Sequence, residues 1–394
     1  MHPTQKTFMV WPPLKQDDYG GAIGAKSYFS WFFGHCCDKI MIPVEKGYIT
    51  QTITDHVSVA SLWDSGKVNF VEASEDFTSV DIVLVRTSDI SKRPVPVATK
   101  KLLGSNPVKT GATDKKATAQ HYFIGTPEDH LQDAYFCVCF SYWYFGGEDA
   151  AFLERSRQRL ISERDQKSLG GKISVFGTGP SINEALRMDF NDSYSIVCNT
   201  IVKNRAFLNR MNLGLIVATD AHFHFSSHRY SARLLSDTLW ALHRHDALFV
   251  TFDKFAAFLR RRVPEFEPYI CGIPAGRKEF GFNLDEDYRV FPGESVLNMF
   301  LLPLAMFMGS EVDLCGFTGR SSTDKYFWGH SDVHQYADLM QDVRSAHPAF
   351  FADRDFQNYG DIVDQQVTER VMLSRAQGKT VRARTTSFYR CFQA

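Results

Sequence analysis

One stretch of the sequence constrains the fold more than any other: residues 172–190, KISVFGTGPSINEALRMDF. Its first apolar residues are typical of a buried strand, and apolar residues from Ile182 onward recur at helical spacing. The motif GTGPS at 177–181 lies between them, and its Pro180 suits the first turn of a helix. The stretch therefore predicts a strand, a glycine-rich turn and a helix.

This turn has two interpretations. Glycines let the backbone approach a ligand closely, and the start of a helix directs free N–H groups at an anion. A plain strand-to-helix turn would use the same residues, so the motif alone leaves both interpretations open.

Strands alternate with helices along the whole chain, which predicts an α/β fold with a parallel sheet flanked by helices. At 394 residues the chain has room for two domains. We expect Rossmann-like domains over 1–168 and 169–394, divided by the glycine pair that follows a charged helix at 148–166. Expected strands lie at 7–10, 39–44, 80–86, 136–145 (a strand or buried segment), 172–176, 194–198, 213–218, 247–251 and 311–315. Further expected helices lie at 28–35 (a helix or loop), 203–211, 230–243, 254–262 and 295–308, and 92–116 is expected to be an exposed loop.

Composition excludes several classes of protein. The net charge of -1 argues against nucleic-acid binding, and the eight cysteines show no zinc-site spacing. Several cysteines lie in apolar runs, where a free thiol behaves as a small buried hydrophobe, which favours a reducing compartment. The opening MHPTQKTFMVW contains no apolar stretch long enough for a signal peptide, and the run VLNMFLLPLAMFMG is too short to span a bilayer. We expect a cytoplasmic protein, with peripheral association at the inner face of the inner membrane left open.

Polar residues follow three expected strands, at the edge where parallel sheets bind ligands. They are the GTGPS turn, Asn199, and Asp220 with His222. Asp220 is the sharpest catalytic candidate, although a helix cap would use the same carboxylate. A metal site that includes His224 would need alternating loop residues to converge, so we expect no metal.

Two further motifs have a chemical and a structural interpretation each. His330, within Trp328-Gly329-His330-Ser331, suits general acid–base catalysis or an ordinary loop. Gly293-Glu294-Ser295 opens a long apolar helix, either as a phosphate site or as a simple N-cap. Nearby cations could pair with a carboxylate or phosphate, or be solvated surface charges: Arg229, Arg320 and Lys325.

Taken in order from 172 to 335, these motifs resemble the CMP-sugar-dependent bacterial sialyltransferases, glycosyltransferase family 42. The resemblance comprises G-x-G-P-S, Cys198-Asn199, Gly-x-Ser at 293–295, Leu-Cys-Gly at 314–316 and Gly-His-Ser at 329–331. It implies His330 as the general base, no metal and no cofactor, because the CMP-sugar is itself the donor. The implied nucleotide-binding residues are Gly177, Thr178, Gly179, Pro180, Ser181, Asn199, Gly293, Glu294, Ser295 and Gly316.

The layout differs from that family in two respects and is similar instead to the retaining β-Kdo transferases of family 99. A long segment precedes the motifs, and Asp220 lies where those inverting enzymes have no catalytic carboxylate that we know of. Family 99 implies two Rossmann-like domains in a GT-B-like arrangement, with an Asp nucleophile on the nucleotide-binding half. Asp220 would then form a covalent glycosyl–enzyme adduct.

The sequence thus predicts a glycosyltransferase that moves Kdo from CMP-Kdo to a cell-surface polysaccharide or glycolipid, as in lipopolysaccharide or capsule synthesis. The domain 1–168 would bind the acceptor and the domain 169–394 the CMP-sugar. The expected contacts to the donor carboxylate or phosphate are His222, Arg229, Arg320, Lys325 and Ser331. An inverting sialyltransferase-like enzyme with His330 as base, a pterin pyrophosphokinase-like protein and a non-catalytic nucleotide-binding protein remain alternatives. Whether the chain is a domain of a larger transferase stays open.

Overall fold

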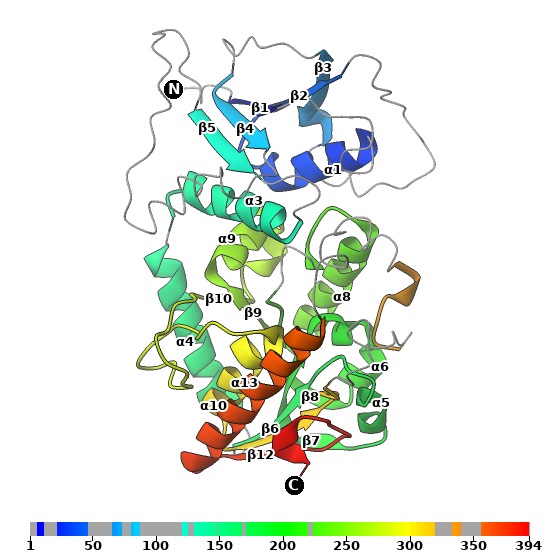
Figure 1. Cartoon of the computed structure of the whole chain (residues 1–394), viewed down its shortest axis with the longest axis vertical. Coiled ribbons are helices and arrows are strands. Elements are labelled where there is room, and N and C mark those ends of the chain that lie inside the picture. Colours follow the sequence, from blue (N-terminus) through cyan, green and yellow to red (C-terminus); the bar gives the residue numbers. More distant parts are fainter. Residues whose placement is uncertain are drawn as a thin grey trace. The chain divides into compact units, whose positions relative to one another are not determined.

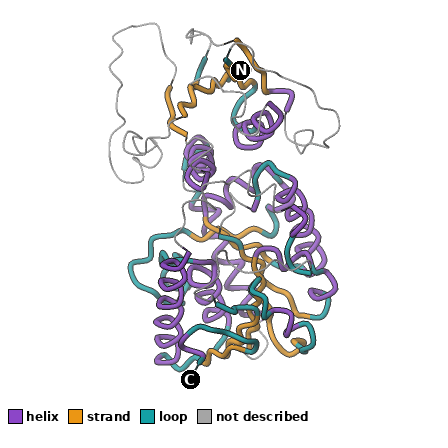
Figure 2. Tube along the Cα trace, turned by 45° about the vertical axis from the view of Figure 1, so that its right-hand side comes forward, coloured by secondary structure: helices purple, strands orange, loops and turns teal. Residues whose placement is uncertain are grey.

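Parallel strands flanked by helices form the described part of the chain, as the alternating sequence pattern predicts. The computed structural model describes residues 6–11, 22–45, 65–72, 80–86, 120–124, 130–147, 149–167, 171–219, 224–319, 333–339 and 356–393. The described residues divide into two units: the first comprises those up to 147 together with 225–232, and the second comprises the remainder. The fold class is therefore α/β (Figures 1 and 2).

The first unit contains a parallel sheet in the strand order β3-β2-β1-β4-β5. Its core is aromatic: Phe8 of β1 packs edge-on against Phe33 of α1 and Phe140 of α3. The elements are β1 Thr7–Trp11, α1 Ala22–Phe33, β2 Lys39–Val44, η3 Ser65–Lys67, β3 Val68–Glu72, β4 Ile82–Arg86, β5 Gln120–Ile124 and α3 His130–Tyr144.

The interpretation of 136–145 as a strand is wrong, because 136–144 belong to helix α3, whereas the alternative of a buried segment holds for 137–142. Residues 137–142 are all buried, so the segment has no polar face to reveal a helical period. A short, continuously apolar run cannot be assigned to strand or helix from periodicity alone.

The second unit contains a larger parallel sheet in the order β10-β9-β8-β7-β6-β11-β12. Its strands are β6 Lys172–Phe176, β7 Phe190–Cys198, β8 Met211–Val217, β9 Leu248–Phe252, β10 Ile270–Ile273, β11 Glu311–Cys315 and β12 Thr380–Ala383. Its helical elements are α4 Ala150–Lys167, α5 Ile182–Ala185, η5 Asn199–Lys203, α6 Arg205–Leu208, α8 Arg229–His245 (whose first turn groups with the first unit), α9 Asp253–Arg262, η6 Pro264–Phe266, η7 Leu297–Leu301, α10 Leu302–Met308, η8 Ala337–Leu339, α13 Phe356–Ala376 and η9 Arg390–Phe392.

Alternate residues of the strands supply the two faces of this sheet. Ile173 and Val175 of β6 face the large core shared with α4, η7, α10 and α13. Phe176 faces the opposite side and packs edge-on against Phe207 of α6. The sheet is thus covered on both faces, and Figure 1 shows α13 in orange beside α10.

Other differences from the sequence expectations concern weakly patterned elements. The expected helix over 203–211 is two short elements, η5 and α6, while β3, β5, β10, β12 and α13 were not expected. Helix α4 packs against β10 and groups with the second unit. The second unit therefore begins at Asp149, about twenty residues before the predicted boundary at 169. The domain roles stay predictions, and the expected loop at 92–116 lies outside the described residues.

No helix within the described ranges combines the length and the apolar character needed to cross a bilayer. All eight cysteines are free thiols, and seven of them are buried.

The close approach of the loops after β6 and β11 gives a test of the fold. Gly316 has φ +75°, and a Cβ there would overlap the carbonyl oxygen of Gly177. We expect Gly316→Ala to lower the free energy of unfolding by at least about 3 kcal/mol, from left-handed strain together with the backbone clash. Urea denaturation of purified protein measures it.

Gly378→Ala is the matched control, because Gly378 has φ +78° but open space around its Cα. The free energy of unfolding of this variant should fall by only about 1 kcal/mol. Equal losses for the two variants would show that the contact between the loops does not add to the stability.

Candidate functional site

The strand order places a topological switch point at β6. The chain proceeds from β6 outward through β7, β8, β9 and β10, whereas β11 lies on the other side of β6. In open parallel sheets, ligands bind at the carboxyl ends of the strands where the order reverses in this way. The two loops at this point are 177–181 after β6 and 316–319 after β11.

These two loops are bonded to each other. The N–H of Gly177 donates to the carbonyl of Cys315 at 2.8 Å, and that of Gly179 donates to the carbonyl of Gly316 at 2.8 Å. A Cβ at Gly177 would overlap the ring of Phe317, and one at Gly179 would overlap the Gly316 carbonyl. Both glycines are therefore required by the packing of the protein itself, and their N–H groups already have partners.

Ser181 belongs to a buried group of three hydroxyls. The Thr318 hydroxyl donates to the Ser181 Oγ at 2.8 Å, and the Ser181 and Thr385 hydroxyl oxygens are 3.2 Å apart. The Thr385 hydroxyl also accepts the N–H of Gly316 at 2.9 Å. A nucleotide contact by Ser181 would have to share or replace one of these bonds.

The helix after the motif is shorter than the sequence pattern suggests. Helix α5 spans the four residues Ile182–Ala185, and the Ser181 side chain does not cap it. So short a helix supplies little dipole for an anion. Within the motif, Pro180 is exposed and Thr178 half-buried, so these two residues keep surface that a ligand could contact.

Asn199 has the geometry of a residue held in place for a contact. It follows β7 directly and has φ +48°, a left-handed conformation that asparagine tolerates better than most residues. Its side-chain Oδ1 is buried without a hydrogen-bond partner among the described residues. An acceptor in this state costs free energy that a ligand donor would recover.

A second segment, residues 333–339, packs beside η5. The Thr200 hydroxyl donates to Gln335 Oε1 at 3.1 Å, and Lys203 Nζ donates to the Gln335 carbonyl at 2.6 Å. The Tyr336 hydroxyl donates to Asp237 at 2.7 Å. The two bonds of Gln335 attach the residues just after the Gly329–Ser331 motif to the segment that begins with Asn199, and the bond of Tyr336 attaches them to α8.

His334 lies in this segment and was not singled out by the sequence. It is fully buried, it meets Phe207 edge-on at 6.1 Å, and neither ring nitrogen has a hydrogen-bond partner among the described residues. Burial lowers its pKa to about 4, with a smaller effect from the charge of Lys203. The imidazole is therefore neutral at pH 7.

The Gly293–Ser295 segment leads into the run of helix that continues through η7, a π-helical turn, and α10. Ser295 has φ +70°, and its Oγ is buried without a partner among the described residues. Glu294 is exposed, and its N–H donates to Gln366 Oε1 at 2.8 Å. Gly293 packs against the guanidinium of Arg370, a second residue that the sequence did not single out.

The remaining predicted residues are Arg229 and six residues that the structure does not describe. Arg229 is exposed at the start of α8 and groups with the first unit, whereas the nucleotide-binding candidates belong to the second. Six candidates lie outside the described residues: Asp220, His222, Arg320, Lys325, His330 and Ser331.

Metal binding finds no support among the residues that the structure describes, where no three His, Cys, Asp or Glu side chains form a candidate site.

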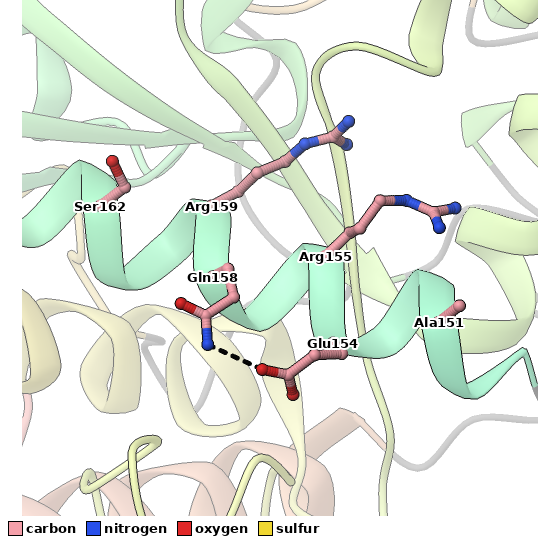
Figure 3. A pocket seen from close by; sticks show the side chains of 6 residues that line it. All are labelled: Ala151, Glu154, Arg155, Gln158, Arg159 and Ser162. Carbon is pink, nitrogen blue, oxygen red and sulfur yellow. Dashed lines mark hydrogen bonds between the residues drawn. The ribbon is translucent and has the colours of Figure 1, made fainter.

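Figure 3 shows a shallow hollow on α4, in which Arg155 and Arg159 extend to the same side and Gln158 bonds Glu154 at 2.7 Å. Arg159 donates to the carbonyl of Ile270, at the amino end of β10. The hollow is therefore remote from the carboxyl edge of the sheet, and it contains none of the predicted site residues.

No protein-family model and no curated protein matches this chain. The case for its function therefore depends on its own residues and their arrangement.

The neutral His334 gives a prediction for the pH dependence of stability. Because its pKa falls from 6.5 to about 4 on folding, the unfolded state binds more protons between these values. The stability that the neutral His334 contributes is therefore fully present above pH 6.5 and is lost as the pH falls towards 4. We expect His334→Phe to remove about 3 kcal/mol of this dependence, measured by urea denaturation at pH 7.5 and 4.5.

His243→Phe is the control, because His243 is an exposed histidine of the same unit. The free energy of unfolding of this variant should change between pH 7.5 and 4.5 as it does in wild type. A wild-type slope in His334→Phe would contradict a neutral, buried imidazole at position 334.

Proposed function

We propose that this protein is a retaining glycosyltransferase that moves Kdo from CMP-Kdo to a cell-surface polysaccharide or glycolipid. The observation that carries the proposal is the switch point of the larger sheet. The loop 177–181 after β6, Asn199 after β7 and Gly316 after β11 all follow strands that end at this edge. Three segments proposed to bind nucleotide thus share the edge where such sheets bind nucleotides.

The division into two units supports a GT-B-like arrangement. Each unit has its own parallel sheet, and the order β3-β2-β1-β4-β5 in the first unit is that of a Rossmann-like half. In the proposed arrangement the second unit binds the CMP-sugar and the first binds the acceptor. Closure of such domains would exclude water and limit hydrolysis of the donor.

The proposed chemistry is a double displacement. Asp220 follows Thr219 at the end of β8, a strand of the nucleotide-binding sheet. Its carboxylate would attack the anomeric carbon while the bond from that carbon to the CMP phosphate oxygen breaks, and CMP leaves with the electron pair. The acceptor hydroxyl then displaces Asp220 and gives up its proton to a base, which restores the original anomeric configuration.

His330 is the proposed base, and it supports a second candidate function. The bonds from Gln335 to Thr200 and Lys203 attach the chain shortly after His330 to the segment that begins at Asn199. This favours a role for the Gly-His-Ser motif near the donor. An inverting sialyltransferase-like enzyme would use His330 as its base in a single displacement, with Asp220 structural.

Intact-protein mass spectrometry with CMP-Kdo generated in situ tests the nucleophile. We expect wild type to gain the mass of one Kdo residue, and Asp220→Ala to gain none while still binding CMP. Asp165→Ala, which removes an exposed carboxylate on α4, is the control and should form the adduct normally. An adduct on Asp220→Ala would contradict the assignment. CMP release that needs acceptor and shows no adduct would favour the inverting candidate.

The rate of transfer tests the base. We expect His330→Ala to slow transfer roughly 10²- to 10⁴-fold, the usual contribution of a general acid or base. The loss should shrink for an acceptor whose hydroxyl is more acidic, because such a hydroxyl depends less on a base. Unchanged turnover would make His330 an ordinary loop residue.

A further inference from the structure

Arg370 of α13 is a buried cation with few partners. Its side chain is only 4 % exposed, and its guanidinium lies over the rings of Phe280 and Phe291, at 4.8 and 5.6 Å from their centroids. Nη2 donates one long hydrogen bond, 3.3 Å, to the carbonyl of Pro292. Nη1 is buried without a hydrogen-bond partner among the described residues.

No carboxylate among the described residues forms an ion pair with Arg370, which is unusual for a buried charge. Burial lowers the pKa of Arg370 to about 10, so the group still carries its charge at pH 7. The charge of Glu369 acts on it, but Glu369 is exposed and forms no ion pair with it. An unpaired buried charge is strongly destabilising, and cation–π contacts offset only part of the cost.

Two buried carboxylates of the second unit, by contrast, have close partners. Asp313 is 1 % exposed and forms ion pairs with Arg382 at 2.9 Å and Arg384 at 3.0 Å. Glu163, also buried, accepts the Tyr194 hydroxyl at 2.9 Å. The incomplete pairing of Arg370 therefore indicates an anion that is not part of the described chain.

The residues around the guanidinium are suited to an anion. Gly293 lies against it so closely that a Cβ there would be 2.6 Å from Nη2 and 2.9 Å from Nη1. Ser295, two residues on, holds a buried hydroxyl without a partner among the described residues and has φ +70°. A guanidinium and a hydroxyl can both donate hydrogen bonds to the oxygens of a phosphate group.

The position in the fold is also that of a ligand site. The helical run from Ser295 ends at Met308, just before β11 begins at Glu311. In a parallel sheet, a helix that returns to the start of a strand begins at the carboxyl edge. The first N–H groups of this helix therefore lie on the carboxyl side of the sheet, the side to which the loops after β6 and β11 also belong.

We propose that Arg370, Ser295 and the first N–H groups of this helix bind a phosphate group. The inference deepens the proposed function by assigning a site for the phosphate of the nucleotide, and it rests on that function only for the identity of the nucleotide. The phosphate could belong to a nucleotide or be free inorganic phosphate, and the experiment separates the two.

Calorimetric titration of the full chain with inorganic phosphate, CMP and cytidine tests the site, alongside thermal unfolding in phosphate-free buffer. We expect Arg370→Met to weaken the binding of phosphate and of CMP roughly 10- to 100-fold, because a charge-assisted hydrogen bond is lost. The affinity of this variant for cytidine should be unchanged. Its melting temperature without anion should equal or exceed that of wild type, because an apolar side chain replaces an unpaired charge. Arg289→Met, which removes an exposed cation four residues before Gly293, is the control and should bind as wild type does.

Two milder variants keep the test decisive if Arg370→Met fails to fold. Arg370→Lys keeps the charge but loses the forked pair of N–H donors, and Ser295→Ala removes only the hydroxyl. Both variants should bind phosphate more weakly and bind cytidine as wild type does. Wild type that binds neither phosphate nor CMP, or variants that bind both as wild type does, would overturn the site. Arg370-dependent binding of phosphate with no binding of CMP would uphold the site and reject the nucleotide of the proposed function.

Discussion

The contact between the loops after β6 and β11 is the constraint on which the second unit depends. Gly177 and Gly179 donate to carbonyls of the β11 loop, and side chains at these positions would overlap it. The hydroxyls of Ser181, Thr318 and Thr385 extend this contact to the chain after β12. The strand order thus reverses at a point where backbone meets backbone, which only glycine allows.

Because the glycine loop satisfies much of its own hydrogen bonding, a ligand at this edge of the sheet would need hydrogen-bonding groups from other segments. Asn199 Oδ1, Ser295 Oγ and Arg370 Nη1 are buried without hydrogen-bond partners among the described residues. Each group carries a desolvation cost in the absence of a partner. Such groups are where a bound ligand gains most, since its contacts recover a cost already present in the folded protein. An amide oxygen suits a donor on a base or sugar, whereas a guanidinium and a hydroxyl suit an anion.

The two kinds of arginine environment in this unit differ in their chemistry. Nη1 of Arg159 on α4 donates to the carbonyls of Glu267 and Ile270. Arg159 therefore holds these segments together at the amino edge of the sheet. Arg370 faces aromatic rings and one distant carbonyl. Both residues carry a charge, but Arg159 Nη1 has two carbonyl partners, whereas Arg370 Nη1 has no hydrogen-bond partner among the described residues.

The sequence by itself determined the α/β class, the strand–turn–helix character of 172–190 and the strands that carry Asn199 and Gly316, because these depend on local periodicity and glycine placement. It did not determine helix α3, whose continuous burial removes the polar face that reveals a period. Only the tertiary structure decided that the Gly177–Ser181 turn binds the β11 loop and that Arg370 lies beside Gly293, residues 77 positions apart in the chain. Partners of this kind are chosen by sheet order and helix packing, and no local pattern of residues specifies which distant groups will meet or remain unpaired.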